Sequence, residues 1–137
     1  MKTTRTILAV VLILASGLTL TVARAQQEKE MPEIKRTDLQ RHDLSAPGLE
    51  TIQTRVDFAP GAAFPKHMHP GEEIIYVIEG AIEYQIEGNA PVIVNAGGVL
   101  FIPNGAPHTA KNAGSVNAAE LGTYVVEKGK ELVTLVK

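Results

Sequence analysis

Residues 61–80 read GAAFPKHMHPGEEIIYVIEG, and residues 97–112 read GGVLFIPNGAPHTAKN. These two blocks, separated by 16 residues, together contain three histidines and a nearby carboxylate: His67, His69, His108 and Glu73. Side chains two positions apart share one face of a strand, whereas on a helix they diverge. The His67-Met68-His69 spacing therefore favours a strand or an extended turn. Pro70-Gly71 then marks a bend before the next strand.

The residue types predict a metal site. Neutral imidazole suits Zn, Cu, Fe and Ni, and a carboxylate adds a hard, charged ligand suited to Fe or Mn. We expect His67, His69, Glu73 and His108 to bind one divalent transition metal, with Fe, Mn, Ni, Cu and Zn all left open. Four protein ligands leave two positions free on an octahedral ion, which a catalytic metal needs for substrate or water.

The two blocks resemble the paired motifs of the cupin superfamily. The first motif, G-x5-H-x-H-x3/4-E-x6-G, is matched by Gly61, His67, His69, Glu73 and Gly80, and the second, G-x5-P-x-G-x2-H-x3-N, by Gly97, Pro103, Gly105, His108 and Asn112. Of the two adjacent glutamates, only Glu73 also gives the six-residue gap to Gly80, so Glu72 is assigned to solvent. The resemblance is to single-domain metal-binding cupins (cupin 2 type, quercetinase-like).

The fold implied by this resemblance is an all-β, single-domain cupin barrel, the double-stranded β-helix or jelly roll. The pattern along the chain agrees with it, because short β-rich runs alternate with Gly, Pro and Asn turns and no amphipathic helix stands out. We expect strands near 36–43, 51–58, 74–78, 81–87, 92–94, 99–102, 108–112, 118–127 and 132–136.

Residues 1–25 have the features of a cleaved secretory signal. Lys2 and Arg5 precede an apolar stretch over 7–22, and Ala23-Arg24-Ala25 is a small-residue cleavage site. We therefore predict a signal peptide at 1–25, a polar flexible leader at 26–35 and a cupin domain at 36–137. The signal resembles those of bacterial proteins. The predicted location is therefore the periplasm or the exterior, with no stable membrane anchor after cleavage.

Composition limits the partners. Losing 1–25 reduces the 13 basic residues to 10 against 15 acidic ones, a net charge of about −5, which gives no reason to expect nucleic acid. There is no cysteine, so stability comes from packing, metal and self-association without disulfides. By analogy with small cupins we expect a homodimer, formed through an edge strand or an arm at 36–43.

Several residues outside the motifs are candidates for the pocket. Glu73, Ile75 and Val77 share one face of their strand, and Tyr76 lies on the other. The apolar wall is expected from Phe64, Ile75, Val77, Phe101 and Ile102, and the polar candidates are Tyr84, Gln85 and Tyr124. Candidate substrate-binding residues are Gln53, Arg55, Phe101 and Tyr124. His42, the fourth histidine, is expected to be an exposed strand residue.

The resemblance implies a small molecule as substrate or ligand, and three classes of function stay open. The first is a dioxygenase-like oxidoreductase, in which Glu73 also acts as a base. The second is a cupin isomerase or lyase. The third is a non-catalytic cupin that binds or senses a metal or a ligand. Only the first two make the protein an enzyme.

Overall fold

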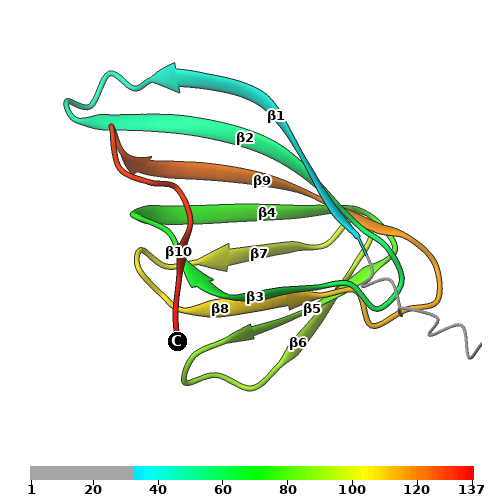
Figure 1. The fold of residues 1–137 in the computed structure, drawn as a ribbon. Helices are drawn as coiled ribbons and strands as arrows, with labels where there is room; N and C mark the ends of the chain where they lie inside the picture. The colour runs from blue at the N-terminus through cyan, green and yellow to red at the C-terminus, as the bar shows by residue number, and fades with distance from the viewer. Residues whose placement is uncertain (1–32) are drawn as a thin grey trace, which may run out of the picture.

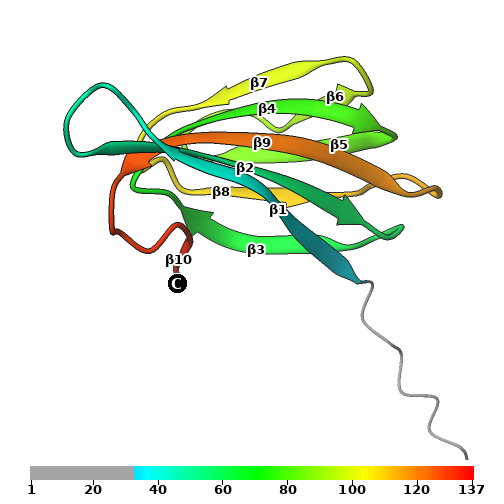
Figure 2. The same ribbon diagram turned by 90° about the horizontal axis from the view of Figure 1, so that it is seen from above.

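The computed structural model describes residues 33–137, which form two facing antiparallel sheets (Figures 1 and 2). Ten strands make up the sheets: β1 (Ile34–Asp43), β2 (Leu49–Phe58), β3 (Ala63–Met68), β4 (Gly71–Glu79), β5 (Ala81–Ile86), β6 (Val92–Asn95), β7 (Val99–Ile102), β8 (His108–Lys111), β9 (Ala118–Glu127) and β10 (Thr134–Leu135). This is the all-β jelly roll that the sequence predicts. Within residues 33–137, no helix is long and apolar enough to cross a membrane.

Each sheet has five strands. Sheet A has the order β1-β2-β9-β4-β7, and sheet B has the order β10-β3-β8-β5-β6. β9, which comes late in the chain, lies between β2 and β4, and it pairs with both in long antiparallel ladders. The chain therefore crosses repeatedly between the two sheets, so residues far apart in sequence meet in the space between them.

The core fills this space because inward-facing and outward-facing residues alternate along the strands. On β2, every even-numbered residue from Glu50 to Phe58 is buried and every odd-numbered one is partly exposed. On β4, Glu73, Ile75 and Val77 are buried while Tyr76 is exposed, as predicted. The main apolar cluster joins both sheets and includes Val56, Phe58, Ile75, Val77, Ile82, Tyr84, Ile102 and Ala118.

Two residues at strand ends, Gly80 and Asn112, fix how neighbouring segments of the chain meet. Gly80, at a φ of 69°, joins β4 to β5, and an added Cβ there would lie 2.6 Å from the Asn117 carbonyl oxygen. Only glycine fits both the backbone angle and the space. Asn112 is fully buried, and its side-chain amide donates to the carbonyls of Phe58 and Val116. It therefore fastens the end of β8 to the end of β2.

The strand predictions differ from the structure in places. β3 did not appear among the predicted runs, although the His67-His69 spacing indicated an extended segment there. β4 begins at Gly71, three residues before the predicted start, because the Pro70-Gly71 bend leads directly into the strand. β1 starts at Ile34, two residues before the predicted domain boundary. The predicted signal peptide and most of the predicted leader lie outside the described residues.

Candidate metal centre

Three histidines meet where β3 and β8 pair in sheet B. His67 near the end of β3 lies opposite His108 at the start of β8, and His69 follows two residues after His67 on the same face. All three are buried, and their nearest ligand nitrogens lie within 4.8 Å of one another. The strand pairing therefore produces the cluster, because it places adjacent in space two residues that are 41 positions apart in sequence.

Backbone carbonyls fix the orientation of each ring. The Nδ1 atoms of His67, His69 and His108 lie 2.8, 2.7 and 2.9 Å from the carbonyl oxygens of Pro65, Leu132 and Ala106. A carbonyl oxygen only accepts, so each Nδ1 carries the proton and donates it. The Nε2 atom of each neutral ring then presents a lone pair. This is the arrangement that metal-binding histidines use.

Glu73 faces this cluster from sheet A. Its Oε2 lies 3.2 Å from Nε2 of His69 and 3.3 Å from Nε2 of His108. Nε2 of His69 is buried and has no hydrogen-bond partner among the described residues. Lone pairs on neutral imidazoles and on a carboxylate repel each other at such distances unless a cation lies between them. The donor set therefore fits a divalent metal ion.

Burial and neighbouring groups act on the protonation of His67 and Glu73. Burial, with a further contribution from His108, lowers the pKa of His67 to about 4, so this imidazole is neutral at pH 7. Burial raises the pKa of Glu73, and His108 and His69 outweigh it and lower that pKa to about 2 only when they carry a proton on Nε2; with both Nε2 atoms unprotonated, a cation at the cluster has to stabilise the Glu73 carboxylate instead. Neutral imidazoles and an ionised carboxylate are the forms that bind metal.

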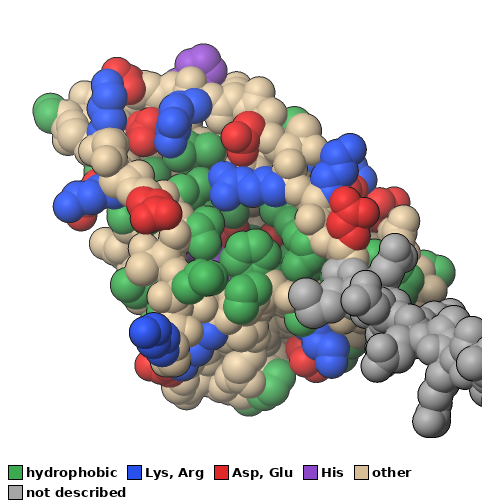
Figure 3. Space-filling model, in the orientation of Figure 1, with side chains coloured by type: hydrophobic (Ala, Val, Ile, Leu, Met, Phe, Trp, Pro, Cys, Tyr) green, Lys and Arg blue, Asp and Glu red, His purple; other side chains and the backbone are tan. Residues whose placement is uncertain are grey.

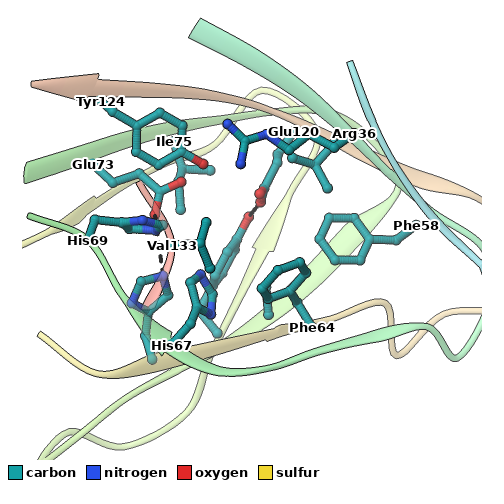
Figure 4. Close-up of a pocket in the computed structure, with 14 residues that line it drawn as sticks. Arg36, Phe58, Phe64, His67, His69, Glu73, Ile75, Glu120, Tyr124 and Val133 are labelled. Carbon is teal, nitrogen blue, oxygen red and sulfur yellow. Dashed lines mark hydrogen bonds and ion pairs between the residues drawn. The ribbon is translucent and has the colours of Figure 1, made fainter. Parts of the chain in front are cut away.

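The cluster lies at one end of a pocket between the sheets (Figure 4). The pocket is partly open to solvent and is lined by residues of both sheets. Its apolar wall is made by Val56, Phe58, Phe64, Ile75, Ala110 and Val133. Figure 3 shows hydrophobic side chains gathered at the centre of one face, with a basic side chain across their upper edge.

A family comparison agrees with this architecture. A protein-family sequence model described as "Cupin domain" matches residues 54–131, which is more than half of the chain. This protein belongs to the cupin family. The match spans both motif blocks and most of the strands that carry the pocket.

Several named proteins are similar to this cupin. Nectarin-1 of Nicotiana langsdorffii x Nicotiana sanderae is 36% identical over 86 residues, covering 57% of this chain and 38% of the relative. Dimethylsulfoniopropionate lyase DddQ of Ruegeria pomeroyi is 37% identical over 63 residues, covering 45% of this chain and 31% of the relative. The cupin thus spans about two fifths or less of the length of these relatives.

Solved structures show the same fold. An oxalate oxidase in complex with the substrate analogue glycolate superposes with a TM-score of 0.61 at 27% identity, covering 75% of this chain and 55% of the other. A cupin-like protein of Thermotoga maritima gives a TM-score of 0.62 at 24% identity, covering 75% of each chain. The two-sheet architecture is therefore shared well beyond the motif blocks.

Only one of the four candidate substrate-binding residues lies in the cupin pocket. Tyr124 of β9 is buried there, with its ring centroid 4.8 Å from that of His69. Gln53 and Arg55 lie on the outward face of β2, where Gln53 contacts Thr123 and Arg55 pairs with Asp57 at 2.7 Å. The odd-numbered positions of β2 face outward, so these two residues do not line the pocket.

Phe101 also lies outside the pocket. It is 56% exposed, because Ile102 takes the inward position on β7. Phe101 forms part of an exposed apolar strip on the outer face of β4 and β7, with Ile74, Tyr76, Ile78 and Val99. Among the expected wall residues, Phe64 and Ile75 line the pocket, as does Tyr84. The lining does not include Val77 and Ile102, which lie in the apolar core, or Gln85. His42 is exposed and Glu72 lies on the outward face of β4.

Two pocket residues carry charge or polarity that sequence reasoning missed. Glu120 of β9 is 5% exposed and accepts a hydrogen bond from the Tyr84 hydroxyl. Arg36 of β1 lines the pocket and pairs at 3.4 Å with Asp38, which is itself highly exposed. Glu120 could have been noticed in the sequence, because it is the one charged residue between Lys111 and Glu127. No comparable signal marked Arg36, which lies in a strand rich in charge.

Proposed function

We propose that this cupin binds one divalent transition metal through His67, His69, Glu73 and His108, and that the metal-loaded protein is an oxidoreductase acting on a small oxygen-bearing molecule. The observation that carries the proposal is the buried Nε2 atom of His69, which faces the Glu73 carboxylate with no donor between them. When bound, the metal would polarise substrate oxygens and hold oxygen ligands at its open positions.

The chain's own residues would bind and orient the substrate. The apolar wall would exclude water from the reacting end of the pocket, and Tyr124 would confine the substrate beside His69. Arg36 is the one lysine or arginine among the residues lining this pocket, so an anionic group on the substrate would be favoured near it. The similarity to an oxalate oxidase in complex with glycolate supports a small oxygen-rich substrate.

A lyase or isomerase is the second candidate. The similarity to a dimethylsulfoniopropionate lyase supports it, and so does the presence of a buried carboxyl, Glu120, in the same pocket. Both candidates would use a metal held by the same four residues; the oxidoreductase would consume dioxygen and the lyase or isomerase would not.

Elemental analysis tests the metal proposal. The purified protein is expected to contain about one metal ion per chain. The His108→Ala variant should lose it, while His42→Ala, which changes an exposed histidine outside the cluster, should keep it. Equal metal content in all three proteins would contradict the assignment. Oxygen uptake with a panel of small organic acids then separates an oxidase from a lyase, and loaded protein that turns over none of them favours a binding or sensing role.

Export and self-association are separate parts of the proposal. Mass analysis of the protein isolated from its native host would show cleavage after Ala25 if residues 1–25 are a signal peptide. Sedimentation analysis would show a homodimer if the expected pairing forms.

A further inference from the structure

Glu120 occupies an unusual place for a carboxyl. It lies in the middle of sheet A, where β9 pairs with Val56 of β2 on one side and Val77 of β4 on the other. Its side chain points inward, and Figure 4 shows it entering the pocket apart from Glu73 and His69. A carboxyl among apolar neighbours costs folding free energy unless it is neutral or paired. The buried position of the Glu120 carboxyl therefore calls for a chemical explanation.

Tyr84 is the partner that holds Glu120. This tyrosine is fully buried on β5 of sheet B, and its hydroxyl donates to Oε2 of Glu120, so the pair bridges the two sheets. No salt bridge to Glu120 occurs among residues 33–137, since the nearby basic group, Arg36, pairs with Asp38. A neutral carboxyl that accepts from Tyr84 still has its own proton to donate.

The charged and titratable groups around the pocket favour this neutral form. They are Glu73 on β4, Tyr124 on β9, Arg36 on β1 and the histidines of sheet B. Burial and the negative charge of Glu73 raise the pKa of Glu120 to about 8, with the Tyr84 hydrogen bond opposing the shift. A group whose pKa lies near the working pH can both give and take a proton.

We propose that Glu120, positioned by Tyr84, is the acid–base residue of this pocket and exchanges a proton with an oxygen of a small organic acid held at the histidine cluster. The inference rests on the proposed function, because it needs a ligand at that cluster. It adds a substrate class: a short acid with a second oxygen function, such as a hydroxy acid, that reaches from the histidines toward Glu120.

The proton transfer balances without another reactant. The O–H bond of Glu120 breaks as an O–H bond forms on a negatively charged substrate oxygen, and the electron pair stays on the Glu120 carboxylate. The Tyr84 hydroxyl stabilises that carboxylate by its hydrogen bond. The reverse step returns the proton to Glu120.

Calorimetry with glycolate as the probe tests the inference on the metal-loaded protein as purified. Binding is measured from pH 7 to pH 10 in buffers of different ionisation enthalpy, for the unchanged protein and for Glu120→Gln. Glutamine keeps the acceptor for Tyr84 but carries no titratable proton. Metal content is measured on both samples, and Gln53→Ala serves as the control for a polar residue outside the pocket.

Above the pH at which Glu120 ionises in the metal-loaded protein, the unchanged protein should take up about one proton per bound glycolate, and its affinity should fall up to tenfold per pH unit more steeply than that of Glu120→Gln. Gln53→Ala should behave as the unchanged protein. Equal proton uptake and equal pH dependence in the unchanged protein and Glu120→Gln would overturn the role of Glu120. Absence of metal in the unchanged protein would instead count against the proposed function.

Tyr84→Phe provides a second variant if Glu120→Gln does not fold. Removing the hydroxyl takes away the hydrogen bond that favours the charged form of Glu120. The pH at which glycolate affinity begins its steep fall should therefore move upward. If glycolate affinity begins its steep fall at the same pH in Tyr84→Phe and in the unchanged protein, the inference is overturned.

Discussion

The stability of Glu120→Gln should depend on pH in a way that reports the buried carboxyl directly. In the folded protein, burial and the charge of Glu73 raise the pKa of Glu120 to about 8 from an ordinary value of 4.5. Between these two pH values the unfolded chain releases this proton and the folded chain keeps it. The unfolded state then binds fewer protons, so the contribution of Glu120 to stability falls as pH rises through this window.

The magnitude follows from the size of the shift. One pKa unit corresponds to about 1.4 kcal/mol, so the full shift sets an upper limit of roughly 5 kcal/mol at pH 8. Relaxation and water entry reduce such costs, and we expect about 2–4 kcal/mol. A glutamine at position 120 has no proton to lose between pH 4.5 and pH 8, so it does not show this pH dependence. Relative to the parent, Glu120→Gln should therefore be nearly neutral at pH 4.5 and should become progressively more stable up to pH 8.

Urea unfolding of the metal-free proteins at pH 5, 6, 7 and 8 would measure this difference. Glu73 and His67 titrate in both proteins, so their contributions largely cancel when the free energies of unfolding are subtracted. Glu83→Gln, a change on the partly exposed face of β5, serves as a control that should show no rising difference. A difference between Glu120→Gln and its parent that stays constant from pH 5 to pH 8 would refute the assignment of a neutral buried carboxyl.

Three further predictions concern the metal and the loops. Metal affinity, measured by chelator competition, should fall as pH drops through about 4, because burial lowers the pKa of His67 to about 4 and its proton then competes with the metal; affinity that is constant down to pH 3 would exclude His67 as a ligand. Gly122→Ala should weaken metal binding without changing any ligand, because the added Cβ would lie 2.9 Å from the Tyr124 hydroxyl and 3.0 Å from Oε1 of Glu73; the neighbouring outward change Thr123→Ala should not weaken it. Asn112→Ala should lower the free energy of unfolding in urea by about 1–3 kcal/mol, because it leaves the buried carbonyl of Phe58 without its donor; a loss below about 0.5 kcal/mol would show that water replaces the amide.

The metal cluster was accessible from sequence because its residues are constrained by short spacings. The two-residue period of a strand aligned His67 with His69. The resemblance to the paired cupin motifs then connected them to His108, a step that spacing alone does not provide. The structure brings these residues and Glu73 together in one buried cluster. What sequence could not supply was the ring orientation, which depends on carbonyls as distant as that of Leu132.

The pocket wall was harder to predict because its members depend on which face of each strand points inward. Phe101 and Ile102 were both expected in the wall, but adjacent residues of a strand point to opposite faces, so Ile102 is buried and Phe101 is exposed. On β2, Gln53 and Arg55 alternate with Thr54 and Val56, and this pattern alone does not show which pair faces the core. Packing of sheet B against one face of sheet A decides it, and that packing is not visible locally.

Glu120 and Arg36 illustrate a limit of a different kind. Each reaches the pocket through the arrangement of the strands, and neither belongs to a sequence motif. Glu120 contacts Tyr84 across the space between the sheets, and Arg36 reaches the pocket only because β1 pairs along β2. The metal end of the pocket is therefore specified by short motifs, whereas its second polar end is specified by the packing of the sheets. Since the packing can change while the motifs stay intact, that second end is where a cupin of this kind can acquire its own choice of substrate.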